Sequence, residues 1–210
     1  MNVVAGTAII EENGLNRARL AGWFRHAPSG RAVALTVAHL LSSLPAPPTD
    51  GVVRDLRAHP RRLCTLDGAE PFALAVACGW SDWTRQVSSL DAAIAEPFVE
   101  FDAPCVACSR VRDGAGVLVG GRAGRVISSA WRSDHFGARA DLLVEPVDNQ
   151  PLTHRGDSGL LVEDEDGAVV GMVVGEVLDL TLAGRYHPWL VCAHPIMELA
   201  RAFSLDVRGG

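Results

Sequence analysis

Three short segments of the sequence carry side chains that could perform nucleophilic chemistry. In the first, Gly156-Asp157-Ser158-Gly159, a serine lies between glycines and is followed by an apolar run. A nucleophilic serine needs an exposed hydroxyl on a tight turn, where backbone N–H groups can stabilise a developing oxyanion. Glycine permits such a turn. By itself, however, the segment also fits an ordinary turn between two strands.

A histidine and an aspartate precede this serine in the chain. His39 follows an apolar segment, and Asp91 stands at the head of another apolar run. Each residue alone has a structural interpretation, as a histidine at a strand end or an aspartate at a strand start. Their order, His39 then Asp91 then Ser158, is one of the orders in which Ser-His-Asp triads occur. Asp82 is a rival acid, but no apolar run follows it, so we favour Asp91.

Short apolar runs set apart by Gly, Pro, Asn and Asp dominate the chain and indicate a mostly β protein. The predicted strands cover residues 7–10, 32–37, 72–78, 116–119, 141–144, 159–162 and 168–174. Asp166-Gly167, between two of these runs, predicts a β-hairpin. Only residues 39–43 and 195–203 show a helical pattern.

These elements predict an all-β fold class with a short C-terminal helix at about 195–204. We expect two β-barrels, the N-terminal one at about 5–103 and the C-terminal one at about 115–193. A Pro-rich loop is expected at 44–49, and a link between the two halves at 102–116.

Composition narrows the function classes. The chain has 210 residues, 48% hydrophobic and 21% charged, which suits one large domain or two closely packed halves. Its formal net charge of −6, without a long basic run, argues against nucleic-acid binding. Glu176 and Asp179 interrupt the longest apolar stretch, so no membrane span is expected. The start of the chain lacks the pattern of a secretory signal, and an odd count of five cysteines suits reduced thiols, so we expect a cytoplasmic protein.

A Cys-x-x-Cys pair, Cys105 and Cys108, invites a zinc or redox interpretation. Two cysteines supply only half of a zinc site, and the βαβ context of thioredoxin-like sites is missing. Cys64 and Cys78 could complete four ligands, but nothing in the spacing demands it. Free thiols are therefore the favoured interpretation, and we expect neither a metal nor another cofactor.

The chemistry-bearing segments resemble those of a known family. Residues 36–39 resemble the T-A-A-H segment of chymotrypsin/trypsin-like serine proteases, residues 91–94 their D-I-A-L segment, and residues 156–159 their G-D-S-G. Further segments similar to strands of this family are 6–10, 120–126, 169–173 and 193–196. Over nearly its whole length, the chain therefore resembles a trypsin-like peptidase domain of the bacterial, HtrA-like kind.

The resemblance implies a single peptidase domain of two packed six-stranded-type β-barrels, acting as a serine endopeptidase on a protein or peptide substrate. His39 would accept the Ser158 proton and later protonate the leaving amine, while Asp91 would hold the imidazole. Backbone N–H groups of Gly156 and Ser158 would form the oxyanion hole, and the reaction would pass through an acyl-enzyme. The substrate-binding residues it implies are Leu152, Thr153, Arg155, Val173, Val174 and Gly175.

The sequence also departs from the family pattern. No R-[IV]-[IV]-G-G activation junction lies near the start, so Asp157 needs another partner or has a structural role in the turn. Control by a regulatory protein or a ligand, or constitutive activity, is then expected. Leu160 and Leu161 replace the usual glycine and proline after the nucleophile. Val174 stands where many members have a serine that supports the catalytic aspartate.

The sequence allows more than one substrate specificity. Counting back from the nucleophile, Leu152 falls at the pocket floor, which favours an uncharged substrate side chain, although Glu176 could attract a basic one. Two other functions also remain. The chain could be an inactive pseudoprotease that binds a protein partner, or a hydrolase of small esters.

Overall fold

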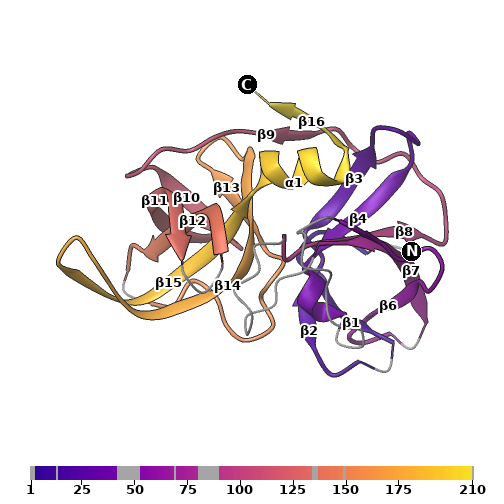
Figure 1. Ribbon diagram of the computed structural model, residues 1–210, viewed down its shortest axis with the longest axis horizontal. Helices are drawn as coiled ribbons and strands as arrows, with labels where there is room; N and C mark the ends of the chain where they lie inside the picture. Colours follow the sequence, from indigo (N-terminus) through magenta and orange to yellow (C-terminus); the bar gives the residue numbers. More distant parts are fainter. Residues whose placement is uncertain are drawn as a thin grey trace.

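The computed structural model describes residues 3–12, 14–41, 53–68, 70–79, 90–133, 137–148 and 150–209. The predicted loop at 44–49 and the rival acid Asp82 lie outside these residues. Two groups of strands stand side by side, one from each half of the chain (Figure 1). Among the described residues, no helix has both the length and the apolar character needed to cross a membrane.

The N-terminal group is a ring of antiparallel strands. In chain order the strands are β1 (Ala8–Glu11), β2 (Arg17–Arg19), β3 (Gly22–His26), β4 (Ala32–Thr36), β5 (Arg54–Asp55), β6 (Arg61–Thr65), β7 (Pro71–Cys78) and β8 (Ala93–Pro97). The pairing runs β2-β1-β6-β7-β8-β4-β3. Only Leu20 and Ala21 separate β2 from β3. The two strands therefore act as one bent strand that completes a barrel.

The C-terminal group closes completely. Its strands are β10 (Gly116–Val119), β11 (Arg122–Ser133), β12 (Gly137–Pro146), β13 (Leu161–Asp164), β14 (Val169–Leu182) and β15 (Arg185–Pro195). The order is β13-β10-β11-β12-β15-β14, and β14 pairs back onto β13. A closed ring leaves no sheet edge unpaired, and side chains fill the interior of a barrel this small.

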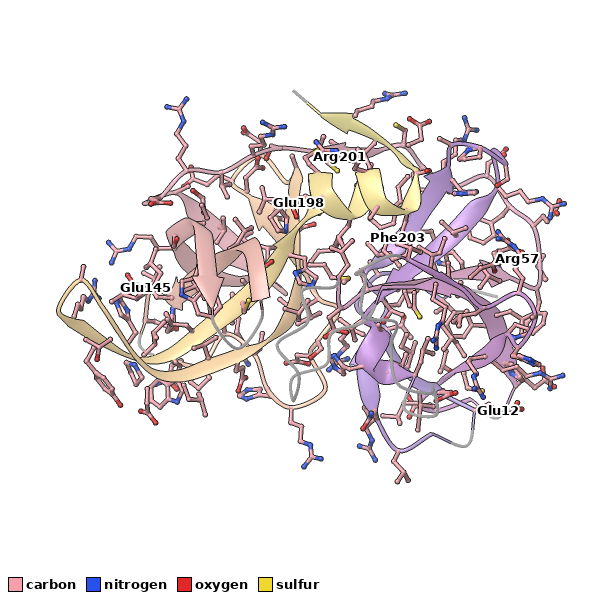
Figure 2. The ribbon with its side chains drawn as sticks, viewed as in Figure 1. Glu12, Arg57, Glu145, Glu198, Arg201 and Phe203 are labelled. Carbon is pink, nitrogen blue, oxygen red and sulfur yellow. The ribbon has the colours of Figure 1, made fainter. Side chains whose placement is uncertain are left out.

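A short helix and a strand follow the second barrel. The helix α1 (Ile196–Phe203) buries one apolar face, and Phe203 at its end lies where the helix meets the N-terminal barrel (Figure 2). The strand β16 (Leu205–Gly209) pairs with β3 and with β9 (Val106–Cys108) of the linking segment. This pairing joins the sheets of the two barrels, and the sequence did not predict it.

Most predicted elements are confirmed with shifted ends. The all-β class and the C-terminal helix are as expected, and Asp166-Gly167 forms the turn between β13 and β14. The run at 159–162 was wrong at its start, because Gly159 and Leu160 belong to a turn and β13 begins at Leu161. The helical pattern at 39–43 is a single 3-10 turn over Ala38–Leu40, and residues 42 and 43 lie outside the described chain.

Two buried apolar clusters support the site. The smaller fills the C-terminal barrel with valines and leucines such as Val126, Val144 and Leu152. The larger fills the N-terminal barrel and continues across the interface to Met172 and to α1. Because this larger cluster is continuous, the facing walls of the two barrels are held together by apolar burial.

Candidate active site

Pairing between β4 and β8 sets the positions of His39 and Asp91. Thr36 at the end of β4 lies opposite Ala93 at the start of β8. In an antiparallel pair, the end of one strand meets the start of its neighbour, so the residues beyond them emerge at the same edge. His39 follows β4 in the 3-10 turn, and Asp91 lies two residues before β8.

His39 and Asp91 are joined by two hydrogen bonds. The Nδ1 of His39 lies 2.6 Å from Oδ2 of Asp91, and the backbone N–H of His39 donates to Oδ1 at 2.9 Å. The Asp91 side chain is only 3% exposed. An ionised carboxylate can only accept, so Nδ1 carries the proton and Nε2 of the neutral ring has a free lone pair.

This contact shifts both pKa values. Burial lowers the pKa of His39, but the attraction and hydrogen bond of Asp91 outweigh it, and the pKa ends above its ordinary value. For Asp91, burial raises the pKa of the carboxyl, while the His39 imidazole and its hydrogen bonds lower it, and the net pKa is below the ordinary value. Asp91 is therefore ionised at neutral pH, and His39 is a stronger base than an isolated imidazole.

Two consecutive tight turns carry Ser158. In the turn at 154–157, the N–H of Asp157 donates to the carbonyl of His154 at 2.9 Å, and Gly156 at the third position has φ +95°. In the turn at 157–160, Gly159 takes the third position with φ +99°. A positive φ at this position is the requirement of a type II turn, which glycine meets without strain.

The turns leave two backbone donors unused. Among the described residues, no group accepts a hydrogen bond from the N–H of Gly156 or from that of Ser158. These are the two donors expected to form an oxyanion hole. Unused N–H groups beside a serine hydroxyl can bind a carbonyl oxygen and stabilise negative charge that develops on it.

Ser158 and His39 open into one cleft of about 660 Å³ between the barrels. The Ser158 hydroxyl donates to the carbonyl of Val174 at 3.4 Å, and it has no hydrogen bond to His39. A rotation of the serine side chain would be needed to bring Oγ to the imidazole. Such bonds are often long or absent without substrate.

The predicted substrate-binding residues divide into two groups. Thr153, Arg155, Val173 and Gly175 line the cleft. Leu152 does not: its side chain is 4% exposed and packs inside the C-terminal barrel, so its interpretation as the pocket floor was wrong. Counting along the chain gave its place in the loop but not the direction of its side chain.

Val174 is also buried in the core and is absent from the cleft lining, so only its carbonyl reaches the site. Its side chain offers Asp91 no hydrogen bond. Instead, the backbone N–H of Asp91 donates to Nε2 of His194 at 3.0 Å, and Nδ1 of His194 lies 2.8 Å from Oδ1 of Asp141. The sequence did not predict this support.

Asp157 has both a partner and a turn role. Its Oδ1 accepts hydrogen bonds from Nε and Nη2 of Arg19, at 3.1 and 3.0 Å, and its Oδ2 accepts the N–H of His154 at 2.9 Å. Arg19 comes from β2 of the other barrel and left no local signal in the sequence. Glu176 is a further cleft residue, where Thr153 donates to its carboxylate at 2.8 Å.

All five cysteines are free thiols. Within the part of the chain that the structure describes, no group of three or more His, Cys, Asp or Glu side chains could hold a metal ion. Cys64 and Cys78 therefore do not complete a site with Cys105 and Cys108. Burial raises the pKa of Cys78 and of Cys108 to about 11, so both are weak nucleophiles at neutral pH.

Comparison with known proteins identifies the architecture of the chain. Neither a protein-family model nor a curated protein sequence matches the chain. Solved structures do. A Nocardiopsis protease is 12% identical with a TM-score of 0.63, covering 99% of this chain and 100% of that chain. A glutamic acid specific serine protease, described as using a histidine triad in substrate binding, is 13% identical with a TM-score of 0.67, covering 98% and 100%.

An inactive form of the Rv3671c protease from M. tuberculosis is 18% identical with a TM-score of 0.54, covering 95% of this chain and 85% of that chain. Identities this low establish architecture rather than activity. The matches nevertheless span both barrels and their order along the chain. This chain therefore has the fold of the chymotrypsin/trypsin-like serine proteases.

Proposed function

We propose that the chain is a serine endopeptidase that hydrolyses peptide bonds with Ser158, His39 and Asp91, in a single peptidase domain. The observation that carries the proposal is the 2.6 Å contact between His39 and buried Asp91, in the cleft into which Ser158 opens. The protease fold of the neighbours supports it.

The proposed reaction begins when His39 Nε2 accepts the Ser158 proton as Oγ attacks the substrate carbonyl. The N–H groups of Gly156 and Ser158 receive the oxyanion, and Asp91 stabilises the imidazolium that forms. His39 then protonates the leaving amine, which departs and leaves an acyl-enzyme. Water, deprotonated by His39, hydrolyses that ester and regenerates Ser158.

A fluorophosphonate probe tests the nucleophile directly. The wild type is expected to be labelled, with labelling lost in Ser158→Ala and strongly reduced in His39→Ala. Ser109→Ala is the control, since Ser109 lies outside the cleft and should leave labelling unchanged. Equal labelling of the wild type and Ser158→Ala would contradict the proposal. Cleavage of a peptide library then separates an endopeptidase from a hydrolase that accepts only small esters.

An inactive pseudoprotease is the second candidate, and one observation favours it. The Ser158 hydroxyl bonds the Val174 carbonyl and not His39. If this arrangement is fixed, the wild type will not react with the probe, even though the cleft can still bind a peptide. Absence of labelling in a correctly folded wild type would support this function over the first.

We propose that activity does not depend on a freed N-terminus, because Arg19 already neutralises Asp157. We also propose a regulatory protein partner. A cytoplasmic location is proposed as well, and the five free thiols support it. We do not propose the glutamic acid specificity of one structural neighbour, because Glu176 in this cleft would repel a glutamate side chain.

A further inference from the structure

The cleft carries opposite charges on its two walls. Glu176 lies on β14 of the C-terminal barrel, and Arg17 lies on β2 of the N-terminal barrel. Both side chains are exposed, and neither forms an ion pair within the described residues. Exposed charges without partners at a binding cleft are available to a charged ligand.

The Glu176 carboxylate is held in place. Thr153, only 3% exposed, donates its hydroxyl to Oε1 at 2.8 Å, and this fixes one oxygen while the other is left for a ligand. A carboxylate oriented in this way suits a guanidinium or an ammonium group, because charge-assisted hydrogen bonds are the stronger kind. Because Leu152 packs inside the barrel and does not form the pocket floor, it gives no reason to expect an uncharged substrate side chain.

The position of His39 identifies which wall faces which part of the substrate. In the proposed reaction His39 protonates the leaving amine, so the leaving segment lies on the His39 side. Asn16 donates to the carbonyl of His39 at 2.8 Å, and Arg17 is the next residue. Arg17 therefore faces the leaving segment. Glu176 is two residues beyond Val174, whose carbonyl contacts Ser158, so it faces the acyl segment.

We propose that the cleft selects peptides with a lysine or arginine on the acyl side of the scissile bond and an aspartate or glutamate on the leaving side. This rests on the proposed function. Arg155, exposed beside Gly156, adds positive charge to the lining of the cleft.

Cleavage of a peptide library by the wild type tests the selection. Peptides with a basic residue before the bond are expected to be cut about tenfold more efficiently than matched glutamine or leucine peptides, the effect of one charge-assisted hydrogen bond. Glu176→Gln should abolish that preference, so that basic peptides and matched glutamine or leucine peptides are cut with similar efficiency. Glu165→Gln makes the same charge change on an exposed residue outside the cleft and should keep it.

Binding keeps the inference testable if the chain proves inactive. Fluorescent peptides of both charge patterns can be titrated onto Ser158→Ala, where the basic-then-acidic peptide should bind more tightly and lose that advantage in Ser158→Ala with Glu176→Gln. A wild-type preference for apolar residues, or a basic preference that survives Glu176→Gln, would overturn the proposal. Absent fluorophosphonate labelling with intact charge-selective binding would instead overturn only the proposed catalysis.

A separate observation concerns a second buried histidine–aspartate pair behind the first. His194 on β15 is 3% exposed and Asp141 on β12 is 1% exposed. The N–H of Asp91 can only donate, so Nε2 of His194 must accept, and its Nδ1 carries a proton that is donated to Asp141. These two contacts fix which nitrogen of His194 accepts and which donates.

We infer that His194 and Asp141 are positioning residues that hold Asp91 against His39. Buried Val174 offers no side-chain hydrogen bond. Within the described part of the chain, the side chain of the second barrel that bonds the Asp91 backbone is that of His194. The barrels are in this way connected through the catalytic aspartate. Loss of His194 is expected to loosen the Asp91 carboxylate and hence the orientation of the His39 ring.

The test uses three variants with two readouts. His194→Leu should lower kcat about tenfold or more with little change in KM, since misorientation costs rate rather than binding. It should also shift or broaden the downfield proton resonance of His39 Nδ1–H. His194→Gln, whose amide can still accept from Asp91, should restore part of both. His187→Gln removes another buried β15 histidine, which bonds Glu145, and should alter neither.

An unchanged kcat and an unchanged His39 resonance in folded His194→Leu would overturn the inference. If His194→Leu does not fold, Asp141→Asn gives the same resonance test with a smaller change in shape. The resonance reports on the His39–Asp91 contact even in an inactive protein, so its outcome is independent of the proposed catalysis.

Discussion

Arg19 and Asp157 form an ion pair across the two barrels, with 3.0 Å between Nη2 and Oδ1. The carboxylate is 15% exposed, so its charge needs a partner. Asp157 closes the turn that presents the Gly156 N–H, and Arg19 also donates its backbone N–H to the Ser158 carbonyl at 2.7 Å. One residue of the first barrel therefore fixes the Ser158 loop of the second barrel.

Arg19→Gln is expected to slow fluorophosphonate labelling about tenfold or more, below the roughly 10²- to 10³-fold cost of losing an oxyanion donor outright. It should also lower the free energy of unfolding by about 1–3 kcal/mol, because Asp157 loses its charged partner. Arg31→Gln removes an exposed ion pair with Glu100 and should leave both measurements unchanged. Equal effects from the two variants would show that Arg19 has no special role.

The pH dependence of labelling should report on His39. The ring must be neutral to accept the serine proton, and its pKa is raised, so the rate should increase with pH through a midpoint above the ordinary histidine value. In Asp91→Asn the attraction that raises this pKa is gone while burial still lowers it, so the midpoint should fall. The plateau should fall by about 10⁴-fold, the cost of the wrong tautomer.

Rates of labelling measured from acid to alkaline pH give both midpoints. Coincident midpoints in the wild type and Asp91→Asn would mean that the Asp91 contact does not set the pKa of His39. Cys105→Ser provides a control, since Cys105 is not among the cleft residues and its loss should leave the curve in place.

Gly159 is expected to tolerate no side chain. A Cβ there would lie 2.1 Å from the carbonyl oxygen of Arg19, and the φ of +99° adds backbone strain. Gly167 has φ +79° with open space around it, so Gly167→Ala carries the strain alone, about 1–2 kcal/mol. Urea unfolding should show a much larger loss for Gly159→Ala. Similar losses in both variants would refute close packing of the barrels at this point.

The sequence indicated the fold class and the three chemistry-bearing segments because each left a local pattern. An apolar run beside His39 or Asp91, and glycines around Ser158, can be read within a few residues. Pairing of β4 with β8 then brought His39 to Asp91, which no local pattern states but the family resemblance implied.

The remaining features depend on contacts between distant residues. Arg19 and Asp157 are 138 residues apart, and Asp91 and His194 are 103 apart, so neither pairing leaves a periodic or local signal. The strand β16 is short and follows directly after a helix, where its pairing with β3 and β9 decides its conformation. The prediction that Leu152 forms the pocket floor was wrong because its loop turns the side chain into the barrel.

The cysteines offer a test that requires no activity. Burial raises the pKa of Cys78 and Cys108 to about 11 and that of Cys192 well above its usual range, so their thiolates are scarce at neutral pH. Iodoacetamide should therefore modify the half-buried Cys105 first, and the other four only after unfolding in guanidinium. Peptide mass mapping identifies the sites. Rapid modification of Cys108 in the folded protein, or protection of Cys105 by added zinc, would revive a function for the Cys-x-x-Cys pair.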